Sequence, residues 1–372
     1  MKVIIGIPCL LTGGTEIQTL SLVEALIAAG HQPVVVCYFE WSANMVKRYE
    51  AVGAAVELLS RDGQRCAGVK NTLVHLWKGF RRVIRVHKPD VAHVQYMAPG
   101  ALPILVLRAL GVKKILATVH TAADIYPSLW QIHWLVRHLL VAFQCITLKA
   151  EYSFFGSCAL FGPDMRFGKY GNHFTIYNNL PSYISQTVTG RTSSVVTIGV
   201  VSRLERIKGM DLVIPAFARV HDKYPHVRLL VVGDGSLRNH MEHQTEELHL
   251  PAEVTEFVGR QAQDALSACY DRIDILLMPS RSEGFGLTAI EGMARGCVPV
   301  VAGVGGLSEV VQDNVCGLVH QPENVEDMAI KIVQAMSDFR NLSSAAIARS
   351  RDFLREQYQS CIAELYSKIY NV

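Results

Sequence analysis

The sequence predicts an α/β protein with two doubly wound parallel-sheet domains, and three observations support this prediction. The chain has 372 residues, and at roughly 100 to 200 residues per domain this length favours two domains. Short β-branched runs alternate with helical patterns, which is typical of βαβ units in a parallel sheet. The alternation starts again after a polar segment that ends at residue 194, so two similar halves follow one another.

The first half contains five predicted strands separated by amphipathic stretches, at residues 3–7, 34–38, 91–96, 115–120 and 174–177. The run at the N-terminus is too short for the core of a signal peptide, and we interpret it as the first buried strand. No stretch reaches the roughly 18 apolar residues of a membrane span. We therefore expect a soluble protein, or at most one that binds a membrane surface.

The second half contains six predicted strands, at residues 195–201, 227–232, 254–258, 273–278, 298–301 and 317–319. Turn residues at 178–182 and a polar segment at 185–194 indicate a hinge between the halves. We expect an N-terminal domain at 1–187 and a C-terminal domain at 195–355. Residues 344–370 have a helical pattern throughout, and the segment 356–372 is expected to be a C-terminal helix that packs on either domain, with a return to the N-terminal domain as one option.

Composition and charge exclude several classes of protein. Half of the residues are apolar and 19% are charged, which excludes a natively unfolded chain. The net charge of +3 is too small to indicate a nucleic-acid binder, although residues 1–190 hold 18 Lys and Arg against 10 Asp and Glu. Nine cysteines without a C-x-x-C pair indicate reduced, cytosolic thiols, most of them in the core.

Ligands of doubly wound sheets bind at the carboxyl ends of the strands, so the loops after strands are the places to search. The first such loop contains Gly13 and Gly14 and precedes a helix expected at 16–29, whose first N–H groups favour an anion. An ordinary tight turn is the alternative. The loop lacks G-x-G-x-x-G, and residues 168–170 lack P-loop spacing, which excludes nicotinamide and P-loop chemistry.

A second loop, residues 202–209, directly follows the first strand of the second half and carries Arg203 and Lys208. A planar guanidinium and an ammonium point charge together suit a diphosphate. Each charge-assisted contact contributes roughly 1.5 to 3 kcal/mol, which is enough to matter for a leaving group. Two solvated charges on a surface loop are the alternative.

A third loop carries two acids eight residues apart, Glu283 and Glu291, with a helix predicted from Leu287. Gly284 and Gly286 allow the backbone to approach a ligand closely, and the helix start offers N–H groups to a phosphate. A carboxylate can accept hydrogen bonds from two vicinal hydroxyls, as in a ribose or a pyranose. The alternative is a capped helix with two solvated acids.

These residues, in this order and at this spacing, resemble the retaining glycosyltransferases of family 4, which have the GT-B fold of two Rossmann-like domains facing across a cleft. The resemblance extends over nearly the whole chain. Six segments carry it: Gly13-Gly14, residues 202–209, residues 232–237, residues 257–259, the E-x7-E motif from Glu283 to Glu291, and residues 305–310.

The resemblance implies that the N-terminal domain binds the acceptor and the C-terminal domain binds a nucleotide-sugar donor. Arg203 and Lys208 would neutralise the departing diphosphate, Glu291 would hold the ribose, and Glu283 would hold the transferred sugar. His120 would lie near the sugar, with a core or capping histidine as the alternative. The other implied donor contacts are Gly13, Gly14, Gly233, Val258, Arg260, Gly284, Phe285, Gly286 and the N–H of Leu287.

The same resemblance implies a hexosyltransferase that retains the anomeric configuration of the donor. No D-x-D occurs in the sequence, so we expect no metal and no other cofactor. Because Glu283 would be occupied with hydroxyls, we favour attack of the acceptor on the face of the leaving diphosphate over a covalent glycosyl-enzyme. We expect UDP rather than GDP in the donor. The chain departs from the family pattern at Arg206, at Asn178-Asn179 and at Thr288, and none of these changes removes a required charge.

The pattern of the helix predicted at 69–88 gives information about the kind of acceptor. Apolar residues lie on one of its faces at helical spacing and five cations on the other, namely Lys78, Arg81, Arg82, Arg85 and Lys88. This pattern suits an anionic membrane surface or a phosphate-bearing lipid acceptor, and a solvated helix face is the alternative. Downstream, Tyr126, Trp130 and Trp134 either line an acceptor groove or belong to the core.

We therefore expect a cytoplasmic enzyme, free or at the inner face of the membrane, that glycosylates a saccharide or lipid-linked saccharide in envelope polysaccharide or glycolipid synthesis. Its expected partners are the nucleotide-sugar, this acceptor and an anionic membrane surface, with no nucleic acid. Two other functions are consistent with the same residues. A nucleotide-sugar epimerase of the same fold would act without an acceptor, and a non-catalytic subunit would bind the donor without turnover.

Overall fold

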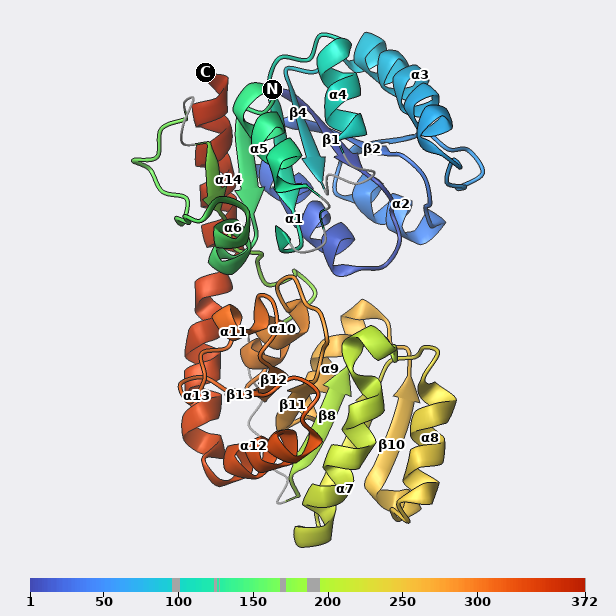
Figure 1. The fold of residues 1–372 in the computed structure, drawn as a ribbon, viewed down its shortest axis with the longest axis vertical. Coiled ribbons are helices and arrows are strands. Elements are labelled where there is room, and N and C mark those ends of the chain that lie inside the picture. The colour runs from blue at the N-terminus through green and yellow to red at the C-terminus, as the bar shows by residue number, and fades with distance from the viewer. Residues whose placement is uncertain (96–100, 124–125, 127, 168–171, 186–194, 372) are drawn as a thin grey trace. The chain divides into compact units, whose positions relative to one another are not determined.

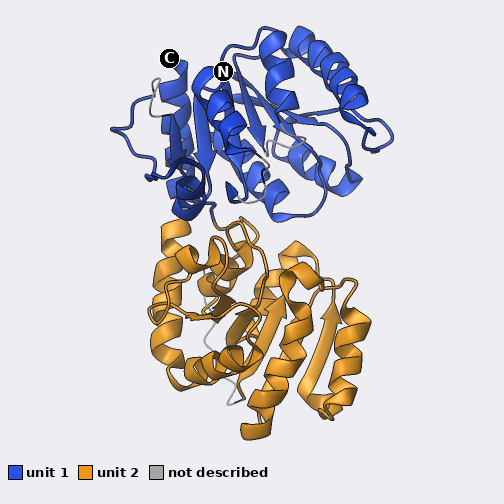
Figure 2. Ribbon diagram, viewed as in Figure 1, with its two compact units in different colours: residues 1–179, 355–372 blue, residues 180–354 orange. Residues whose placement is uncertain are grey.

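The computed structural model describes residues 1–95, 101–123, 126, 128–167, 172–185 and 195–371. The chain divides into two compact units, each built on a parallel sheet (Figure 1). Unit 1 consists of residues 1–179 and 355–372, and unit 2 of residues 180–354 (Figure 2). The boundary at 179 and 180 lies within the turn segment predicted at 178–182. Residues 168–170 and most of the polar segment predicted at 185–194 lie outside the described residues.

Unit 1 contains a seven-stranded parallel sheet in the order β3-β2-β1-β4-β5-β6-β7. Its strands are β1 (Lys2–Ile7), β2 (Gln32–Cys37), β3 (Ala55–Leu58), β4 (Val91–Gln95), β5 (Ile115–Val119), β6 (Ala142–Cys145) and β7 (His173–Thr175). In the centre of the sheet, Ile4 of β1 lies opposite Val34 of β2 and Ala92 of β4. Central strands of this kind are buried on both faces and consist of continuous apolar runs.

The helices of unit 1 cover its sheet (Figure 1). They are α1 (Gly14–Ala28), α2 (Ala43–Ala51), α3 (Val69–His87), α4 (Leu102–Ala109), α5 (Leu129–His138), α6 (Leu148–Phe155) and α14 (Arg355–Tyr370). Ser42 and Thr147 cap α2 and α6, because each side chain accepts a hydrogen bond from a first-turn N–H. Among the described residues, no helix is both long and apolar enough to cross a bilayer.

Two strands of unit 1, β3 and β6, are absent from the sequence prediction. The prediction for α3 is also wrong in part. Leu76, Phe80 and Val83 are fully buried as expected, but Leu73 and Trp77 of the predicted buried face are 41% and 40% exposed. The apolar stripe of α3 is therefore wider than the surface that the unit covers.

Unit 2 contains a six-stranded parallel sheet in the order β10-β9-β8-β11-β12-β13, and all six strands correspond to predicted ones. They are β8 (Thr197–Val201), β9 (Arg228–Val232), β10 (Thr255–Gly259), β11 (Ile275–Met278), β12 (Val298–Ala302) and β13 (Leu318–His320). The α-helices are α7 (Val213–Lys223), α8 (Arg238–Glu247), α9 (Leu266–Asp271), α10 (Leu287–Ala294), α11 (Leu307–Val310), α12 (Val325–Ser337) and α13 (Phe339–Ser350). Short 3₁₀ turns at Arg206–Lys208 and Met210–Leu212 follow β8.

The C-terminal segment is not one continuous helix, contrary to the prediction for 344–370. Helix α13 ends in a 3₁₀ turn, and Leu354 then adopts an extended conformation with ψ of 147° before α14 begins. This break coincides with the return of the chain to unit 1. There the hydroxyl of Tyr366 lies 2.8 Å from His93 Nδ1, and Arg355 forms an ion pair with Glu24.

Candidate functional site

The loops at the carboxyl ends of β8 and β9 lie backbone against backbone in unit 2. Gly233 follows β9 with a φ of 137°, and a Cβ atom at this position would lie 1.8 Å from the carbonyl oxygen of Ser202. A Cβ at Gly235 would lie 2.5 Å from the carbonyl oxygen of Leu204. Only glycine permits such a close approach, so Gly233 and Gly235 allow the loops after β8 and β9 to pack against each other.

The loop after β11 is joined in the same way to the loops after β8 and β12. Gly209, which ends the first 3₁₀ turn, has a φ of 68°, and a Cβ there would lie 1.9 Å from the carbonyl oxygen of Pro279. A Cβ at Gly305 would lie 1.8 Å from the carbonyl oxygen of Glu283. The cationic loop at 202–209 and the E-x7-E loop are therefore neighbours, as expected for loops at one edge of a parallel sheet.

Lys208 and Glu283 form the central ion pair of this edge. Lys208 Nζ donates to Glu283 Oε2 at 2.6 Å, and both side chains are about one-fifth exposed. The hydroxyl of Ser280 lies 3.5 Å from the same carboxylate oxygen. The residue predicted to bind the diphosphate and the residue predicted to bind the sugar thus contact each other directly.

Arg203 lies in the same loop with an exposed side chain. Its charge helps to lower the pKa of Glu205, although the main cause is the hydrogen bonds that this carboxylate accepts from Ser236. Arg206, the extra cation of the loop, is also exposed. The loop therefore offers cationic side chains at the surface of unit 2 beside the Lys208 pair.

Arg281 holds the turn that carries Lys208. Its guanidinium donates to both carboxylate oxygens of Asp211, at 2.6 and 2.9 Å, and also to the carbonyl oxygen of Arg206. Burial alone would raise the pKa of Asp211, but the hydrogen bonds from Arg281 override this effect and lower it. Neither Arg281 nor Asp211 carries a functional signal in the sequence, because their pairing spans 70 residues of chain.

Helix α10 begins at Leu287, as predicted. Gly286 precedes it with a φ of 99°, and the side chain of Phe285 is 3% exposed and packs edge-on against Phe353. The Phe285 ring is therefore turned into the unit and does not join Glu283 at the edge of the sheet. The N–H of Ala289 donates to the carbonyl of Gly286 at 2.9 Å, whereas the N–H groups of Leu287 and Thr288 lie at the very start of the helix and are suited to a phosphate oxygen.

Glu291 is buried within α10, so the alternative of two solvated acids is wrong for this residue. Its side chain is 4% exposed. Oε1 accepts from the hydroxyl of Tyr183 at 2.7 Å, and Oε2 accepts from the hydroxyl of Tyr270 at 2.6 Å. Burial raises the pKa of Glu291, and the two tyrosine hydroxyls oppose this shift. Neither tyrosine carries a signal in the sequence.

Two of the implied donor contacts, Val258 and Arg260, lie at the end of β10. Val258 is partly buried, and its carbonyl oxygen accepts from Gln261 Nε2 at 3.0 Å. Arg260 is exposed. Val258 lies near the end of β10, the strand next to β9, and Arg260 follows that strand, so both lie at the same sheet edge as Gly233.

The other predicted site residues, Gly13, Gly14 and His120, belong to unit 1. Helix α1 begins at Gly14, and a Cβ at Gly13 would lie 2.6 Å from Glu16 Oε2. Glu16 is buried and also accepts from Cys9 Sγ, whose pKa is raised to about 12 by burial and by this carboxylate. The predicted anion site at this helix start therefore already has a carboxylate beside it, which the sequence analysis missed.

His120 follows β5 and is 8% exposed. Its Nε2 lies 3.1 Å from Gln95 Oε1, at the end of the adjacent strand β4. Burial lowers the pKa of His120 to about 4, so the imidazole is neutral at physiological pH. Among the described residues, Gln95 Nε2 and Thr121 Oγ1 are buried polar atoms with no hydrogen-bond partner.

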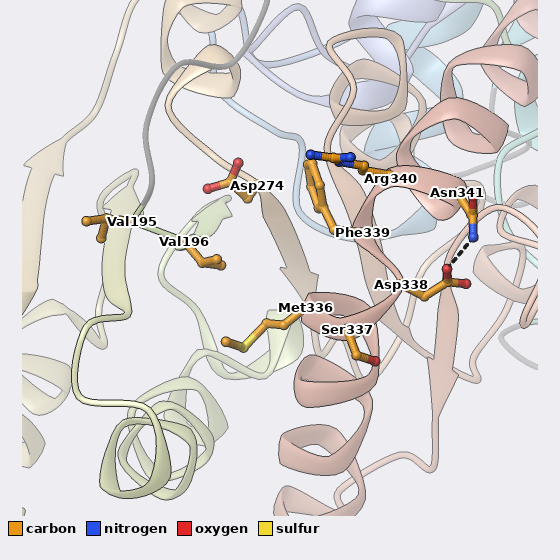
Figure 3. A pocket seen from close by; sticks show the side chains of 9 residues that line it. All are labelled: Val195, Val196, Asp274, Met336, Ser337, Asp338, Phe339, Arg340 and Asn341. Carbon is orange, nitrogen blue, oxygen red and sulfur yellow. Dashed lines mark hydrogen bonds between the residues drawn. The ribbon is translucent and has the colours of Figure 1, made fainter.

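A pocket in unit 2 lies at the opposite, amino-terminal ends of β8 and β11 (Figure 3). It is lined by Val195, Val196 and Asp274 on one side and by residues 336–341 on the other. None of the predicted site residues lines it. Elsewhere in the described part of the chain, no group of three His, Cys, Asp or Glu side chains is placed to hold a metal ion. Metal independence remains a prediction.

Solved structures identify the class of fold. A glycosyltransferase from Rickettsia africae has a TM-score of 0.79 at 19% identity, covering 99% of this chain and 98% of that chain. The Anabaena protein HepE, in complex with UDP and glucose, also has a TM-score of 0.79 at 19% identity, covering 99% of both chains. The fold is GT-B, as the sequence predicts.

Two family models match different parts of the chain. Residues 12–158 match the family Glycosyltransferase Family 4, and residues 188–352 match Glycosyl transferases group 1. This chain is therefore similar in sequence to the glycosyltransferases that these two families describe.

Individual relatives are similar over parts of their length. Sulfoquinovosyl transferase SQD2 of Arabidopsis thaliana is 27% identical, covering 68% of this chain and 50% of that protein. D-inositol 3-phosphate glycosyltransferase of Kribbella flavida is 30% identical, covering 45% of this chain and 42% of that protein. The chain spans about a third to a half of the length of the first curated relatives it matches.

Proposed function

We propose that this chain is a retaining, metal-independent hexosyltransferase that uses a nucleoside diphosphate sugar, UDP-linked rather than GDP-linked. The observation that carries the proposal is the Lys208–Glu283 pair, which lies at the carboxyl edge of the sheet of unit 2, beside the start of α10. A cation, a carboxylate and the first N–H groups of a helix suit a sugar diphosphate. The UDP and glucose bound by the Anabaena neighbour support the choice of donor.

Lys208 and Arg203 would stabilise the leaving diphosphate. As the bond between the sugar and the diphosphate breaks, negative charge grows on the phosphate oxygens, and nearby cations lower the energy of that transition state. When a phosphate oxygen takes Lys208 Nζ, Glu283 loses its partner in the pair. Its carboxylate is then available to accept hydrogen bonds from sugar hydroxyls.

The transfer itself would proceed on one face of the sugar. The acceptor oxygen forms the new bond to the anomeric carbon while the bond to the diphosphate oxygen breaks, and the acceptor proton passes to that diphosphate oxygen. Atoms and charge balance without an enzymic nucleophile. His120 would serve as a neutral hydrogen-bonding group, because burial keeps it unprotonated. The adjacent Gln95 amide would bind a hydroxyl.

The acceptor would be a saccharide or lipid-linked saccharide of polysaccharide or glycolipid synthesis, met at the cytoplasmic membrane face. Helix α3 supports the membrane part of this proposal. Its apolar side chains Val69, Leu73, Val74 and Trp77 are 71%, 41%, 46% and 40% exposed. Exposed cations accompany them, namely Lys70, Lys78, Arg81, Arg82, Arg85 and Lys88. Apolar and cationic groups on one helix suit an anionic bilayer.

A liposome assay tests the membrane proposal. Sedimentation with phosphatidylglycerol vesicles should carry the protein down, and pure phosphatidylcholine vesicles should leave it in solution. The double variant R81E/R85E should lose binding, whereas R219E, a charge reversal in α7, should keep it. Equal binding to both kinds of vesicle would reject the proposal.

Thermal unfolding with UDP-sugars and GDP-sugars, with and without EDTA, tests the donor proposal, because a ligand of the folded state raises the unfolding temperature. A selective shift that EDTA does not change and that Arg203→Ala abolishes is expected. Product analysis then separates the activities. Transfer requires an acceptor, an epimerase alters the donor alone, and a binding subunit leaves the donor intact. Absence of a shift with every donor would contradict the proposal.

A further inference from the structure

The carboxylate of Glu291 is held by one tyrosine on each oxygen. Tyr183 donates to Oε1 at 2.7 Å and Tyr270 donates to Oε2 at 2.6 Å. A buried carboxylate without donors is costly, so these two hydroxyls account for how Glu291 is tolerated at 4% exposure. They also occupy the two atoms that would accept the hydroxyls of a ribose.

The two tyrosines differ in how firmly they are enclosed. Tyr270 lies in α9 and is completely buried. Tyr183 is only partly buried and lies in the segment that follows the unit boundary. Its backbone is fixed, because the hydroxyl of Ser267 donates to the Tyr183 carbonyl at 3.3 Å and Arg295 donates to the carbonyl of Ser185 at 2.8 Å. Tyr183 is therefore the less enclosed of the two hydroxyl donors to Glu291.

A tyrosine hydroxyl and a ribose hydroxyl make the same kind of bond to a carboxylate, an O–H donor on a charged oxygen. A vicinal diol that binds a carboxylate uses one oxygen for each hydroxyl. Glu291 is 4% exposed and its Oε1 already accepts from Tyr183, so a ribose hydroxyl and the tyrosine hydroxyl compete for the little space at this oxygen.

We propose that the Tyr183 hydroxyl takes the place of one ribose hydroxyl on Glu291, and that a nucleotide binds by exchanging it. This inference rests on the proposed function and adds a specificity residue to it. Glu291 keeps two donors before and after the exchange only if the ligand brings a hydroxyl. A ligand without the 2′ and 3′ hydroxyls would leave Oε1 unsatisfied when it displaced Tyr183. The residue thus selects ribonucleotides.

The experiment compares dissociation constants from calorimetry for a nucleoside diphosphate and its 2′,3′-dideoxy counterpart. UDP, GDP and ADP are first tested on the unaltered protein. Tyr183→Phe removes the competing hydroxyl, so the ribonucleotide should bind about 10-fold more tightly, the size of one charge-assisted hydrogen bond. The dideoxynucleotide should bind within about twofold of its original strength, because it gains no bond to Oε1.

Tyr270→Phe is the matched control, because it also removes one hydroxyl from Glu291 but at a fully buried ring. It should not tighten ribonucleotide binding. Circular dichroism checks that both variants fold, and Tyr183→Leu serves as a second variant if the phenylalanine ring itself hinders exchange. Glu291→Gln should bring the two nucleotides to similar affinities.

The outcomes separate the inference from the proposed function. Failure of all three nucleotides to bind the unaltered protein would reject the proposed function and the inference with it. Binding that Tyr183→Phe weakens, or that it changes equally for both nucleotides, would reject the inference alone. In that case Tyr183 shapes the pocket and does not compete for the carboxylate.

Discussion

Lys208 Nζ lies 2.6 Å from Glu283 Oε2. The cation expected to bind the leaving diphosphate and the carboxylate expected to bind the transferred sugar therefore form one neutral pair. The two residues are 75 positions apart and come from the loops after β8 and β11. Binding of a sugar diphosphate would separate them, because each then gains a better partner. The pair therefore makes the two halves of donor recognition interdependent.

Substitutions of the two residues should have opposite effects on diphosphate binding. Lys208→Met should weaken UDP binding by about 10- to 100-fold, the value of a charge-assisted contact. Glu283→Gln should maintain or strengthen it, because Lys208 then loses its competing carboxylate, while transfer activity should fall by roughly 100-fold. Calorimetry and a transfer assay measure the two effects. Lys223→Met, at an exposed lysine of α7, is the control, and equal loss of UDP binding in both variants would show that the pair only supports the loop.

The glycines that join the loops can be tested by a comparison at matched backbone angles. Gly209 and Gly156 have φ values of 68° and 67°, but only Gly209 faces another backbone, with Pro279 O 1.9 Å from an added Cβ. Gly156→Ala should cost roughly 1 to 2 kcal/mol, the ordinary cost of a left-handed residue. Gly209→Ala should cost at least about 3 kcal/mol, because the two loops must also separate.

Urea denaturation measures both free energies of unfolding. Nucleotide binding supplies a second readout, since Gly209→Ala should also weaken it and Gly156→Ala should not. Similar costs for the two substitutions would mean that the contact between the loops relaxes easily and does not hold the site together.

The strands of unit 2 were predictable because buried parallel strands consist of continuous β-branched and aliphatic runs. The two missed strands lack that signal for different reasons. Strand β3 lies at the edge of the sheet, is partly exposed and contains a glutamate. Strand β6 has the sequence AFQC, which has no β-branched residue, although it is fully buried. Its position is set by its neighbours β5 and β7.

The site was predictable to the extent that it depends on loops after strands. A parallel sheet brings these loops to one edge, and the order of the strands brings Lys208 and Glu283 together. The partners of the site residues were not predictable in this way. Tyr183 and Tyr270 contact Glu291 from 108 and 21 positions away, and only the packing of α9 and of the segment after the unit boundary brings them there. Glu16 beside Gly13 was missed because its carboxylate turns back onto the start of its own helix.

The buried imidazole of His120 should make stability depend on pH. Burial lowers its pKa from 6.5 to about 4. Between these two pH values His120 is protonated in the unfolded chain but not in the folded chain. The free energy of unfolding therefore decreases as the pH falls through this window, by roughly 3 kcal/mol at its lower end. His93, with a pKa lowered to about 3 by burial, acts in the same direction.

Replacement of His120 by asparagine should therefore reduce the loss of stability between pH 7 and pH 4.5. Urea denaturation at several pH values measures the slope, which should become shallower by about one proton. His226→Asn, at an exposed histidine, should leave the slope unchanged. A slope that is the same in all three proteins would mean that His120 gains solvent or a counter-charge in the folded state.

Arg281 should position Lys208 through the turn that both residues share. Its guanidinium binds Asp211 with two hydrogen bonds and also holds the carbonyl of Arg206, so it fixes both 3₁₀ turns after β8. Lysine keeps the charge but has no planar fork to make these bonds together. Arg281→Lys should leave the folded state intact and displace the turn.

The expected result for Arg281→Lys is a loss of about 5- to 10-fold in UDP affinity with little change in uridine affinity, because the turn carries a phosphate contact and no base contact. Calorimetry with both ligands measures this difference. Arg219→Lys is the control, because Arg219 forms an exposed pair with Glu326 on the surface of α7, away from the site. Equal weakening of UDP and uridine binding would mean that Arg281 supports the unit as a whole. Unchanged UDP affinity would mean that Lys208 needs no support from Arg281.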